Sequence, residues 1–371
     1  MIDETLTNPD FPCVSRLDVA CYRIPTDGPE ADGTLRWSET ELVVVHVEAG
    51  DRVGMGYSYT AAEPAANLIL DKLAPVLVGR CVFDIPVLWQ DMNRALRNVG
   101  RPGLGLMAIA AVDQALWDVK ARLLDLPLSA LWGRARSSVP IYGSGGFVTY
   151  SPQRLQRQLE GWVEQGLKAV KIKIGDDPRQ AEQRVHLARE VVGPDVQLMV
   201  DANGACQARD ALALAECLGD YGVCWFEEPV CSDDLEGLRW LRDRVPDDMA
   251  IAAGEYGWDS VYFRRMLQAG AVDVLQVDAT RCGYTGFLHA AELCSAFHVP
   301  ISAHCAPALH TPLCVAVSGL RHAEYFHDHA RVESVLFDSG DSLHEGALWP
   351  DLERIGHGIE LRSADAEPYR I

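Results

Sequence analysis

The sequence lacks the features that mark several large classes of protein. Its 11 cysteines form no CxxC pair, no apolar run approaches the roughly 20 residues of a membrane span, and no low-complexity tract is present. The first residues, MIDETLTNPDF, show neither the basic nor the apolar segment of a secretory signal. These absences argue against a zinc ribbon, a membrane protein and a secreted one. We expect a cytoplasmic protein with reduced thiols and no membrane partner.

Basic residues are also scarce. The 371 residues include 33 Lys and Arg against 53 Asp and Glu, which gives a formal net charge of −20. An acidic surface repels polyanions, so nucleic acid is not expected as a partner. A small anionic substrate is still compatible with this charge, because a bound divalent cation reverses the local field. The length favours one large barrel with a smaller domain beside it.

What the chain does contain is a series of short apolar segments, each ending in an acid or a base. Six residues end these segments: Lys173, Asp201, Glu227, Glu255, Asp278 and His304. Their spacings of 28, 26, 28, 23 and 26 residues fit one strand plus one helix, and short apolar runs are typical of parallel strands buried on both faces. We therefore predict an α/β barrel with its active site at the C-terminal ends of the strands. The alternative is that strand ends simply tolerate polar residues. One acid or base at a strand end would mean little, but six at corresponding positions argue against this alternative.

The segment before this series has a different order of elements. Residues 14–57 are typical of antiparallel strands joined by a polar stretch, Thr26 to Gly33, that we expect to be a mobile loop. Helical patterns follow, and strands followed by helices indicate an α+β domain. We predict this domain at residues 1–136, the barrel at 137–348, and a C-terminal tail at 349–371 that packs back on the first domain.

Asp201, Glu227 and Glu255 end three consecutive segments of the series. Three converging carboxylates repel one another unless a positive charge lies between them, and Mg²⁺ prefers oxygen ligands of this kind. The shell lacks the His and Cys residues typical of zinc. We predict that the three acids bind Mg²⁺. The alternative is that some of the three acids form structural ion pairs with lysines or arginines of the barrel. Glu228, next to Glu227, should point to the opposite face of the strand, and we expect it to support the site or the structure rather than bind the metal.

Two groups in the series have the chemistry of proton transfer. Lys171 and Lys173 face the same side of their strand, and the charge of Lys171 is expected to lower the pKa of Lys173 and make Lys173 a base. Lys171 would also bind a substrate carboxylate. A carboxylate such as Asp278 can fix the tautomer of a neighbouring His304 and raise its basicity. A lone histidine is more often structural, but the place of His304 in the series favours an acid/base role.

The motifs KIK, VDAN, FEEP, AAGE, VDATRCGYTG and SAH resemble the mandelate racemase subgroup of the enolase superfamily, over nearly the whole chain. The resemblance implies a modified TIM barrel, (β/α)₇β, with an N-terminal α+β capping domain whose loops close over the barrel mouth. It also implies a role for each site residue: Mg²⁺ ligands Asp201, Glu227 and Glu255; opposed bases Lys173 and His304, the latter paired with Asp278; and a protonated Glu324 that donates a hydrogen bond to the substrate carboxylate. Asn203 resembles a residue near the metal.

Two positions depart from the family pattern. Tyr284 stands where a second glycine is common, and it is expected to alter its loop or to place a phenol in the site. Cys206 stands where many relatives carry tryptophan. Cys206, Cys282 and Cys305 all follow strand ends and are candidates to line the site. Specificity is expected to come from loops, including the Thr26 to Gly33 stretch.

The resemblance implies abstraction of the proton α to a carboxylate, with Mg²⁺ holding the resulting enediolate. We expect an acid-sugar dehydratase that forms a 2-keto-3-deoxy acid, and a racemase or epimerase using Lys173 and His304 stays open. Cycloisomerases and dipeptide epimerases are disfavoured because Asp278 stands where they carry a lysine. A metal-dependent amidohydrolase is disfavoured because HxH occurs only late, at His327 to His329. A non-catalytic paralogue is disfavoured because no ligand or base is missing. The expected partners are a small carboxylate substrate and further copies of the chain.

Overall fold

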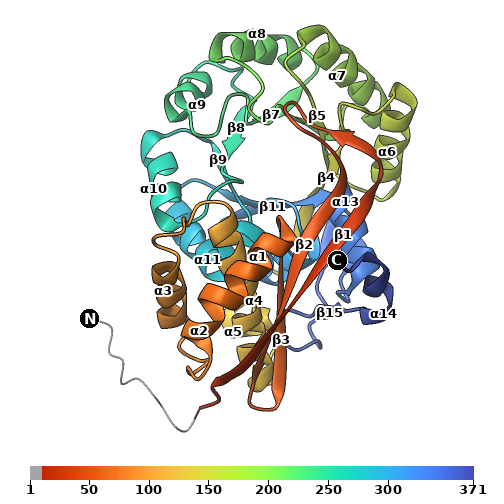
Figure 1. Cartoon of the computed structure of the whole chain (residues 1–371). Helices are drawn as coiled ribbons and strands as arrows, with labels where there is room; N and C mark the ends of the chain where they lie inside the picture. The colour runs from red at the N-terminus through yellow and green to blue at the C-terminus, as the bar shows by residue number, and fades with distance from the viewer. Residues whose placement is uncertain (1–10) are drawn as a thin grey trace.

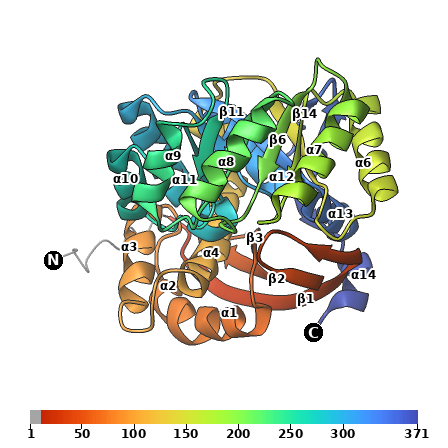
Figure 2. The same ribbon diagram turned by 90° about the horizontal axis from the view of Figure 1, so that it is seen from above.

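The computed structural model describes residues 11–371 and places two layers on top of each other. Figure 1 looks along the barrel, and Figure 2 shows the antiparallel sheet and its helices lying on one side of it. Among the described residues, every helix is too short or too polar to traverse a lipid bilayer. The two layers are the predicted barrel and the predicted α+β domain, called the capping domain below.

In residues 11–371, eight parallel strands form a barrel in which neighbours in sequence are neighbours in space. The strands are β4 (Val139–Gly145), β5 (Ala169–Lys173), β6 (Gln197–Asp201), β7 (Val223–Glu227), β8 (Ala250–Ala253), β9 (Val274–Val277), β10 (Ile301–Ala303) and β11 (Leu320–Phe326). The barrel closes where Ala323 of β11 pairs with Ile141 of β4. The strands are short and almost wholly buried, as their apolar runs indicated. The predicted fold class is confirmed.

A helix follows each barrel strand and covers its outer face. The helices are α6 (Pro152–Glu164), α7 (Pro178–Val192), α8 (Ala208–Gly219), α9 (Leu235–Arg242), α10 (Ser260–Ala269), α11 (Ala279–Phe297), α12 (Pro307–Ala316) and α13 (His327–Leu336). Several begin at an aspartate whose side chain accepts backbone N–H groups of the first turn: Asp177, Asp234, Asp259 and Asp278. Such caps satisfy donors that the helix itself leaves unpaired, so these helices have fixed starting points close to the strand ends.

The capping domain consists of a three-stranded antiparallel sheet and a set of helices. Its elements are β1 (Val14–Ala31), β2 (Arg36–Ala49), β3 (Arg52–Tyr59), α1 (Ala62–Leu68), the π-helical turn η1 (Ile69–Leu73), α2 (Ala74–Leu77), α3 (Ile85–Ala95), α4 (Leu104–Leu123) and α5 (Leu128–Trp132). Helix α4 packs so closely on β3 that a Cβ atom on Gly56 would collide with the carbonyl oxygen of Ala111. The close contact therefore requires glycine at this position. Two polar side chains of α4 pair with β3: Gln114 and Asp118 accept the amides of Tyr57 (2.8 Å) and Met55 (2.9 Å).

The capping domain is attached to the barrel at the start of α11, directly after Asp278. Ser58 of β3 donates to the carbonyl oxygen of Thr280 at 2.6 Å, and Gln114 of α4 donates to that of Ala279 at 2.8 Å. Asp113, also on α4, accepts from the amide and the hydroxyl of Thr285 at 2.8 and 2.6 Å. These bonds are buried, so they fix one edge of the capping domain against the barrel mouth.

The last segments of the chain contact both layers. They comprise β12 (Phe337–Asp338), β13 (Ser342–His344), β14 (Ala347–Trp349), β15 (Glu360–Leu361), α14 (Ser363–Ala366) and the 3₁₀ turn η2 (Glu367–Tyr369). The amide of Ile371 donates to the carbonyl oxygen of Cys21 in β1 at 3.0 Å, and the amide of His357 donates to Asp118 in α4 at 2.8 Å. The division into parts at 1–136, 137–348 and 349–371 stays a prediction.

The Thr26 to Gly33 stretch is not the loop that its composition predicted. Strand β1 continues to Ala31 and pairs with β2 beyond a register shift between Pro25 and Glu30. Only a short turn remains, in which the Asp32 carboxylate accepts the amides of Thr34 and Leu35 at 2.6 and 2.7 Å. Cross-strand pairing therefore overrides the Gly- and Pro-rich composition. Figure 1 shows the resulting β1–β2 hairpin reaching across the barrel mouth.

Gly33, at the tip of this hairpin, touches the backbone of two barrel strand ends. A Cβ atom there would collide with the carbonyl oxygen of Ala202 and lie 2.9 Å from that of Ile174. We expect Gly33→Ala to push the hairpin off the mouth and to raise KM about tenfold, because overpacking costs about 1–3 kcal/mol. The melting temperature should change little, since the tip contributes little to the core. Steady-state kinetics and thermal unfolding provide the two measurements.

The matched control is Gly319→Ala, because a Cβ atom on Gly319 meets no atom within 4 Å. The control should leave KM unchanged. An unchanged KM in Gly33→Ala as well would show that the hairpin tip does not govern access to the barrel mouth.

Candidate functional site

The series of polar residues predicted from the sequence does meet at one end of the barrel. Lys173, Asp201 and Glu227 are the last residues of β5, β6 and β7, and they are paired in register across the three strands. The other three residues lie just beyond their strands: Asp278 and His304 directly follow β9 and β10, and Glu255 lies two residues after the end of β8. All six are buried. Parallel strands bring their C-terminal ends to the same rim, which is why this pattern could be read from the sequence.

The three carboxylates predicted to hold a metal lie close enough to share one ion. Asp201, Glu227 and Glu255 each offer an oxygen atom within 4.8 Å of the others. Burial, and then the nearby Asp201 carboxylate, raise the pKa of Glu227 to about 8. The upward shift in the pKa of Glu227 therefore reflects burial first and, second, negative charge that Lys171 compensates only in part. Three buried carboxylate oxygens with no His or Cys ligand among them fit a hard divalent cation such as Mg²⁺.

Both lysines of the KIK motif pair with these acids. The Lys171 Nζ atom lies 2.5 Å from Glu227 Oε1 and 2.8 Å from Glu324 Oε1, and the Lys173 Nζ atom lies 2.5 Å from Asp201 Oδ2. Ion pairing, the alternative to metal binding, therefore occurs in this arrangement. The lysines occupy only part of the acid cluster, because Glu255 has neither lysine as an ion-pair partner within 4.0 Å among the described residues.

The expected low pKa of Lys173 is wrong for this arrangement. Burial lowers the pKa of its ammonium group and Lys171 lowers it further, as predicted, but Asp201 and the other acids raise it, and the net pKa lies above its usual value. The prediction counted the neighbouring lysine and left out a carboxylate at 2.5 Å. Lys173 is therefore cationic here, and it can accept a proton only after the charge of Asp201 has been taken up by another group.

His304 and Asp278 form the predicted pair. The Nδ1 atom of His304 lies 3.0 Å from Asp278 Oδ2, and its Nε2 atom lies 3.1 Å from Glu255 Oε2. Burial lowers the pKa of His304, but its acidic neighbours raise it well above the usual value, so the ring is an imidazolium. The other oxygen of Asp278 accepts the amide of Thr280 at 2.7 Å. A helix cap thus fixes the carboxylate that orients the imidazole.

Lys173 and His304 lie on nearly opposite sides of the barrel. Their strands β5 and β10 are five positions apart in one direction round the closed sheet and three in the other. Each side chain points toward the acid cluster, since each pairs with one of its members: Lys173 with Asp201 and His304 with Glu255. A small molecule bound at this cluster would therefore have a proton-transfer group on two faces.

Glu324 lies in the same cluster but in a different state from the one that the resemblance implied. Its Oε2 atom accepts the backbone amide of Cys305 at 2.8 Å, and its Oε1 atom lies 2.8 Å from Lys171 Nζ. Burial raises the pKa of Glu324, but Lys171 and then His304 lower it further, and the net pKa is well below the usual value. The predicted protonated donor is therefore an ionised acceptor here, because two cations and an amide surround it.

The two departures from the family pattern do not reach the acid cluster. Tyr284 is fully buried, its hydroxyl donates to the carbonyl oxygen of Leu309 at 3.2 Å, and its ring packs against Trp132. Of the two alternatives for Tyr284, the phenol in the site is therefore wrong, because the hydroxyl is bonded to Leu309 and the ring is packed on Trp132. Of the three candidate cysteines, Cys305 alone is hydrogen-bonded to a predicted site residue among the described ones, with Sγ 3.3 Å from His304 Nε2.

One aromatic contact between the two domains was not predicted from the sequence. Tyr59 of the capping domain and His329 of α13 stack with ring centroids 3.6 Å apart. His329 belongs to the HDH motif, whose first histidine pairs with Asp27 of the hairpin at 3.0 Å. The motif therefore lies at the interface between the domains. The Met55–Tyr59 segment gave no signal that its last residue would stack on a histidine some 270 positions later.

Comparison with known proteins agrees with the geometry of both layers. Residues 23–133 match the family model of the mandelate racemase / muconate lactonizing enzyme N-terminal domain, and residues 154–366 match that of the enolase C-terminal domain-like family. A solved mandelate racemase/muconate lactonizing enzyme-like protein from Rubrobacter xylanophilus is 48% identical, with a TM-score of 0.94 over 97% of this chain and 100% of its own.

Three of the relatives illustrate different reaction types. A 3,6-anhydro-alpha-L-galactonate cycloisomerase of Streptomyces coelicolor is 31% identical over 94% of this chain and 97% of its own. An L-talarate/galactarate dehydratase of Salmonella typhimurium is 29% identical over 87% and 81%. A racemase from Streptomyces coelicolor, solved with bound magnesium, is 29% identical, with a TM-score of 0.88 over 96% and 100%.

A cycloisomerase is thus among the relatives, although Asp278 disfavours that reaction for this chain in the sequence analysis. The family matches also remove the amidohydrolase alternative, because both layers of this chain match one superfamily. On these two matches, which together extend from residue 23 to residue 366, the chain is an enzyme of the mandelate racemase/muconate lactonizing enzyme family in the enolase superfamily.

Proposed function

We propose that the protein is a Mg²⁺-dependent acid-sugar dehydratase that abstracts the proton α to a carboxylate and expels the β-hydroxyl group. One observation carries the proposal: three buried carboxylates, Asp201, Glu227 and Glu255, lie between Lys173 on one side and the His304–Asp278 pair on the other. This arrangement can hold a carboxylate substrate and transfer protons on both of its faces. Relatives named as dehydratases of acid sugars support the substrate class.

The residues divide the work as follows. Asp201, Glu227 and Glu255 would hold Mg²⁺, which supplies positive charge for the developing enediolate and relieves Lys173 of its carboxylate partner. With its pKa lowered in this way, Lys173 would lose its own proton to the solvent and could then accept the α proton of the substrate. His304, an imidazolium oriented by Asp278, donates a proton to the β-hydroxyl group, which leaves as water. The enol that remains tautomerises to a 2-keto-3-deoxy acid, so atoms and charge balance. Lys171 is placed to bind the substrate carboxylate.

Racemisation or epimerisation of a 2-hydroxy acid is the second candidate. The placement of Lys173 and His304 on opposite sides of the closed sheet favours it, because one group can remove a proton while the other returns one to the opposite face. The relative solved as a racemase supports this alternative. Both candidates use the same groups and differ in whether a leaving group is present at the β carbon.

A panel of aldonates, aldarates and 2-hydroxy acids, followed by proton NMR in D₂O with Mg²⁺, separates the two candidates. A dehydratase gives a keto acid, whereas a racemase introduces deuterium at the α carbon without loss of water. We expect a keto acid from at least one sugar acid, and no reaction after the divalent cation has been removed with EDTA. A complete set of sugar acids that gives no keto acid would count against dehydration. Turnover in EDTA would count against the metal.

A further inference from the structure

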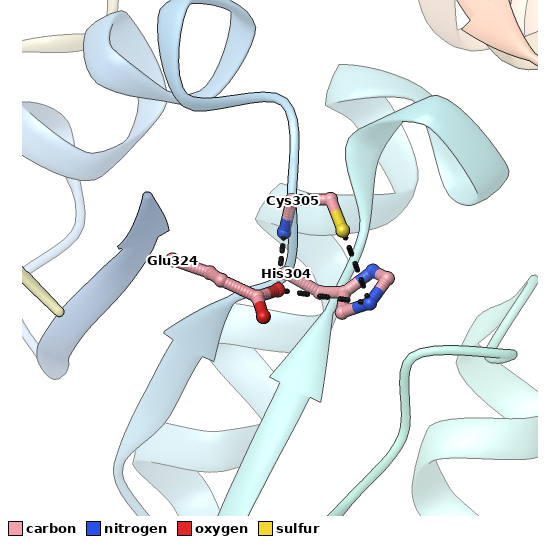
Figure 3. A group of neighbouring side chains, drawn as sticks. All are labelled: His304, Cys305 and Glu324. Atoms are coloured by element: carbon pink, nitrogen blue, oxygen red, sulfur yellow. Dashed lines mark hydrogen bonds and ion pairs between the residues drawn. The ribbon is translucent and has the colours of Figure 1, made fainter. Parts of the chain in front are cut away.

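His304, Cys305 and Glu324 form a second cluster of potential metal ligands, different in kind from the three carboxylates (Figure 3). The Cys305 Sγ atom lies 3.3 Å from His304 Nε2, and Glu324 Oε2 lies 3.7 Å from the same nitrogen. All three residues are buried, and one ligand atom of each lies within 4.8 Å of the others. Sulfur, imidazole nitrogen and carboxylate oxygen are a ligand set that zinc and its softer relatives prefer.

The backbone holds Cys305 in an unusual conformation that serves both of its contacts. Cys305 has φ = 56° and the next residue, Ala306, has φ = 38°, both in the left-handed region that residues other than glycine rarely adopt. Such conformations cost about 1–3 kcal/mol each and persist only where the surroundings impose them. Here the turn directs the amide of Cys305 to Glu324 and its thiol to His304. One residue thus orients the two other ligands of the cluster.

The imidazole is also prepared for metal binding through its other nitrogen. Asp278 holds Nδ1 of His304 at 3.0 Å, so Nε2 is the atom that faces Cys305, Glu324 and, at 3.1 Å, Glu255. A carboxylate on the far nitrogen of a ligand histidine fixes its tautomer and raises its basicity, and such partners accompany most metal-bound histidines. The Asp278–His304 pair is therefore suited to a metal on Nε2 as well as to proton transfer.

We propose that Nε2 of His304, Sγ of Cys305 and Oε2 of Glu324 form a site for a soft divalent cation of the zinc type. The site uses none of the three predicted Mg²⁺ ligands but adjoins one of them, since Glu255 Oε2 lies 3.1 Å from the same nitrogen. One nitrogen, one sulfur and one oxygen ligand at about 2.0–2.3 Å from a tetrahedral zinc lie about 3.3–3.6 Å apart. The separations of 3.3 and 3.7 Å from His304 Nε2 are within a few tenths of an ångström of this range. On binding, the S–H bond of Cys305 and the Nε2–H bond of the His304 imidazolium break, a sulfur–metal and a nitrogen–metal bond form, and both protons pass to the solvent. Two anionic ligands then neutralise the cation, and the fourth position is open.

The surroundings favour a metal over direct reaction of the thiol. Cys305 packs in an apolar cluster with Phe147, Tyr150 and Phe326, partly covered by Trp37. Burial, followed by the charge of Glu324, raises the pKa of the Cys305 thiol, so the free thiol stays protonated and is a poor nucleophile. A divalent cation overcomes this because it replaces the proton directly. Occupation of Nε2 removes His304 from proton transfer, so the bound cation inhibits the enzyme.

Cobalt(II) tests the proposal, because a sulfur–cobalt bond gives a near-ultraviolet charge-transfer band that oxygen ligands do not give. The protein is first saturated with Mg²⁺ so that the carboxylate site is occupied, and Co²⁺ is then titrated in. We expect one band per chain, which Zn²⁺ removes, and inhibition by Zn²⁺ with the same stoichiometry. Cys305→Ser should abolish the band and weaken inhibition by about 100-fold or more, relative to its own activity without zinc.

The matched control is Cys206→Ser, which removes another buried cysteine that belongs to no ligand group among the described residues. This control should keep the band. A band that persists in Cys305→Ser, or that excess Mg²⁺ abolishes, overturns the proposal. Should Cys305→Ser not fold, X-ray absorption at the zinc edge of the wild-type protein decides: one sulfur neighbour at about 2.3 Å supports the site, and an all-oxygen shell refutes it.

Discussion

Turnover should fall by about 10²–10⁴-fold when Lys173 is replaced by alanine, and by a similar factor in His304→Asn, because each variant loses a positioned proton-transfer group. The two variants should differ in how they exchange the α proton of a substrate or of an unreactive substrate analogue in D₂O. Lys173→Ala keeps the group on the β10 side of the barrel, and His304→Asn keeps the one on the β5 side. Each should therefore exchange a proton from one face only, as NMR of the two stereoisomers of an analogue reveals.

Matched controls exist for both changes. Lys168, just before β5, and His289, within α11, are exposed residues of the same types. Lys168→Ala and His289→Asn should leave turnover within twofold of the wild type, because surface substitutions away from the core and the active site have small effects. Full turnover in the double variant of Lys173 and His304 would remove both groups from the mechanism and with them the proposed function.

Replacing a single carboxylate of the acid cluster should be at least as damaging. Asp201→Asn, Glu227→Gln and Glu255→Gln each remove a charged oxygen ligand, and we expect turnover to fall by at least about 10³-fold, since a metal supplies several kcal/mol of charge stabilisation in the transition state. The apparent affinity for Mg²⁺, measured by calorimetry, should fall in parallel. In Asp201→Asn the ammonium of Lys173 also loses its partner at 2.5 Å, which should lower the melting temperature of the metal-free protein.

Asp248→Asn serves as the control, because Asp248 is an exposed acid that precedes β8 rather than following it. It should leave both Mg²⁺ affinity and turnover unchanged. Normal Mg²⁺ affinity in all three variants would mean that the acids do not bind the metal and only form structural ion pairs with their neighbours.

The barrel and the positions of its polar residues were predictable because one short-range rule governs them. Each apolar run forms a strand, and the residue at its end must lie at the rim, whatever the loops do. Lys173, Asp201 and Glu227 follow this rule to the residue, since they pair in register. Glu255 lies two residues beyond its strand and still joins the cluster, because a short loop keeps it at the rim.

Protonation states and long-range contacts were not predictable in the same way. The pKa of Lys173 and of Glu324 depends on which partner lies nearest in space, and the sequence gives neighbours along a strand but not the distances across the barrel. The extent of β1 was missed because its pairing with β2 outweighs the turn-forming residues within it. The contact of Tyr59 with His329 joins two domains, and no local pattern encodes such a pair.

The anchoring of the capping domain at the start of α11 has a consequence for variation far from the acid cluster. The bonds from Ser58 and Gln114 end on Thr280 and Ala279, and the amide of Thr280 is itself bound to the carboxylate that steers the imidazole. A small tilt of the capping domain on the barrel would therefore shift Thr280, and through Asp278, two residues earlier, it would shift the imidazole ring of His304. Remote substitutions at this seam should therefore slow catalysis while leaving substrate affinity intact, a signature opposite to that of changes in the hairpin.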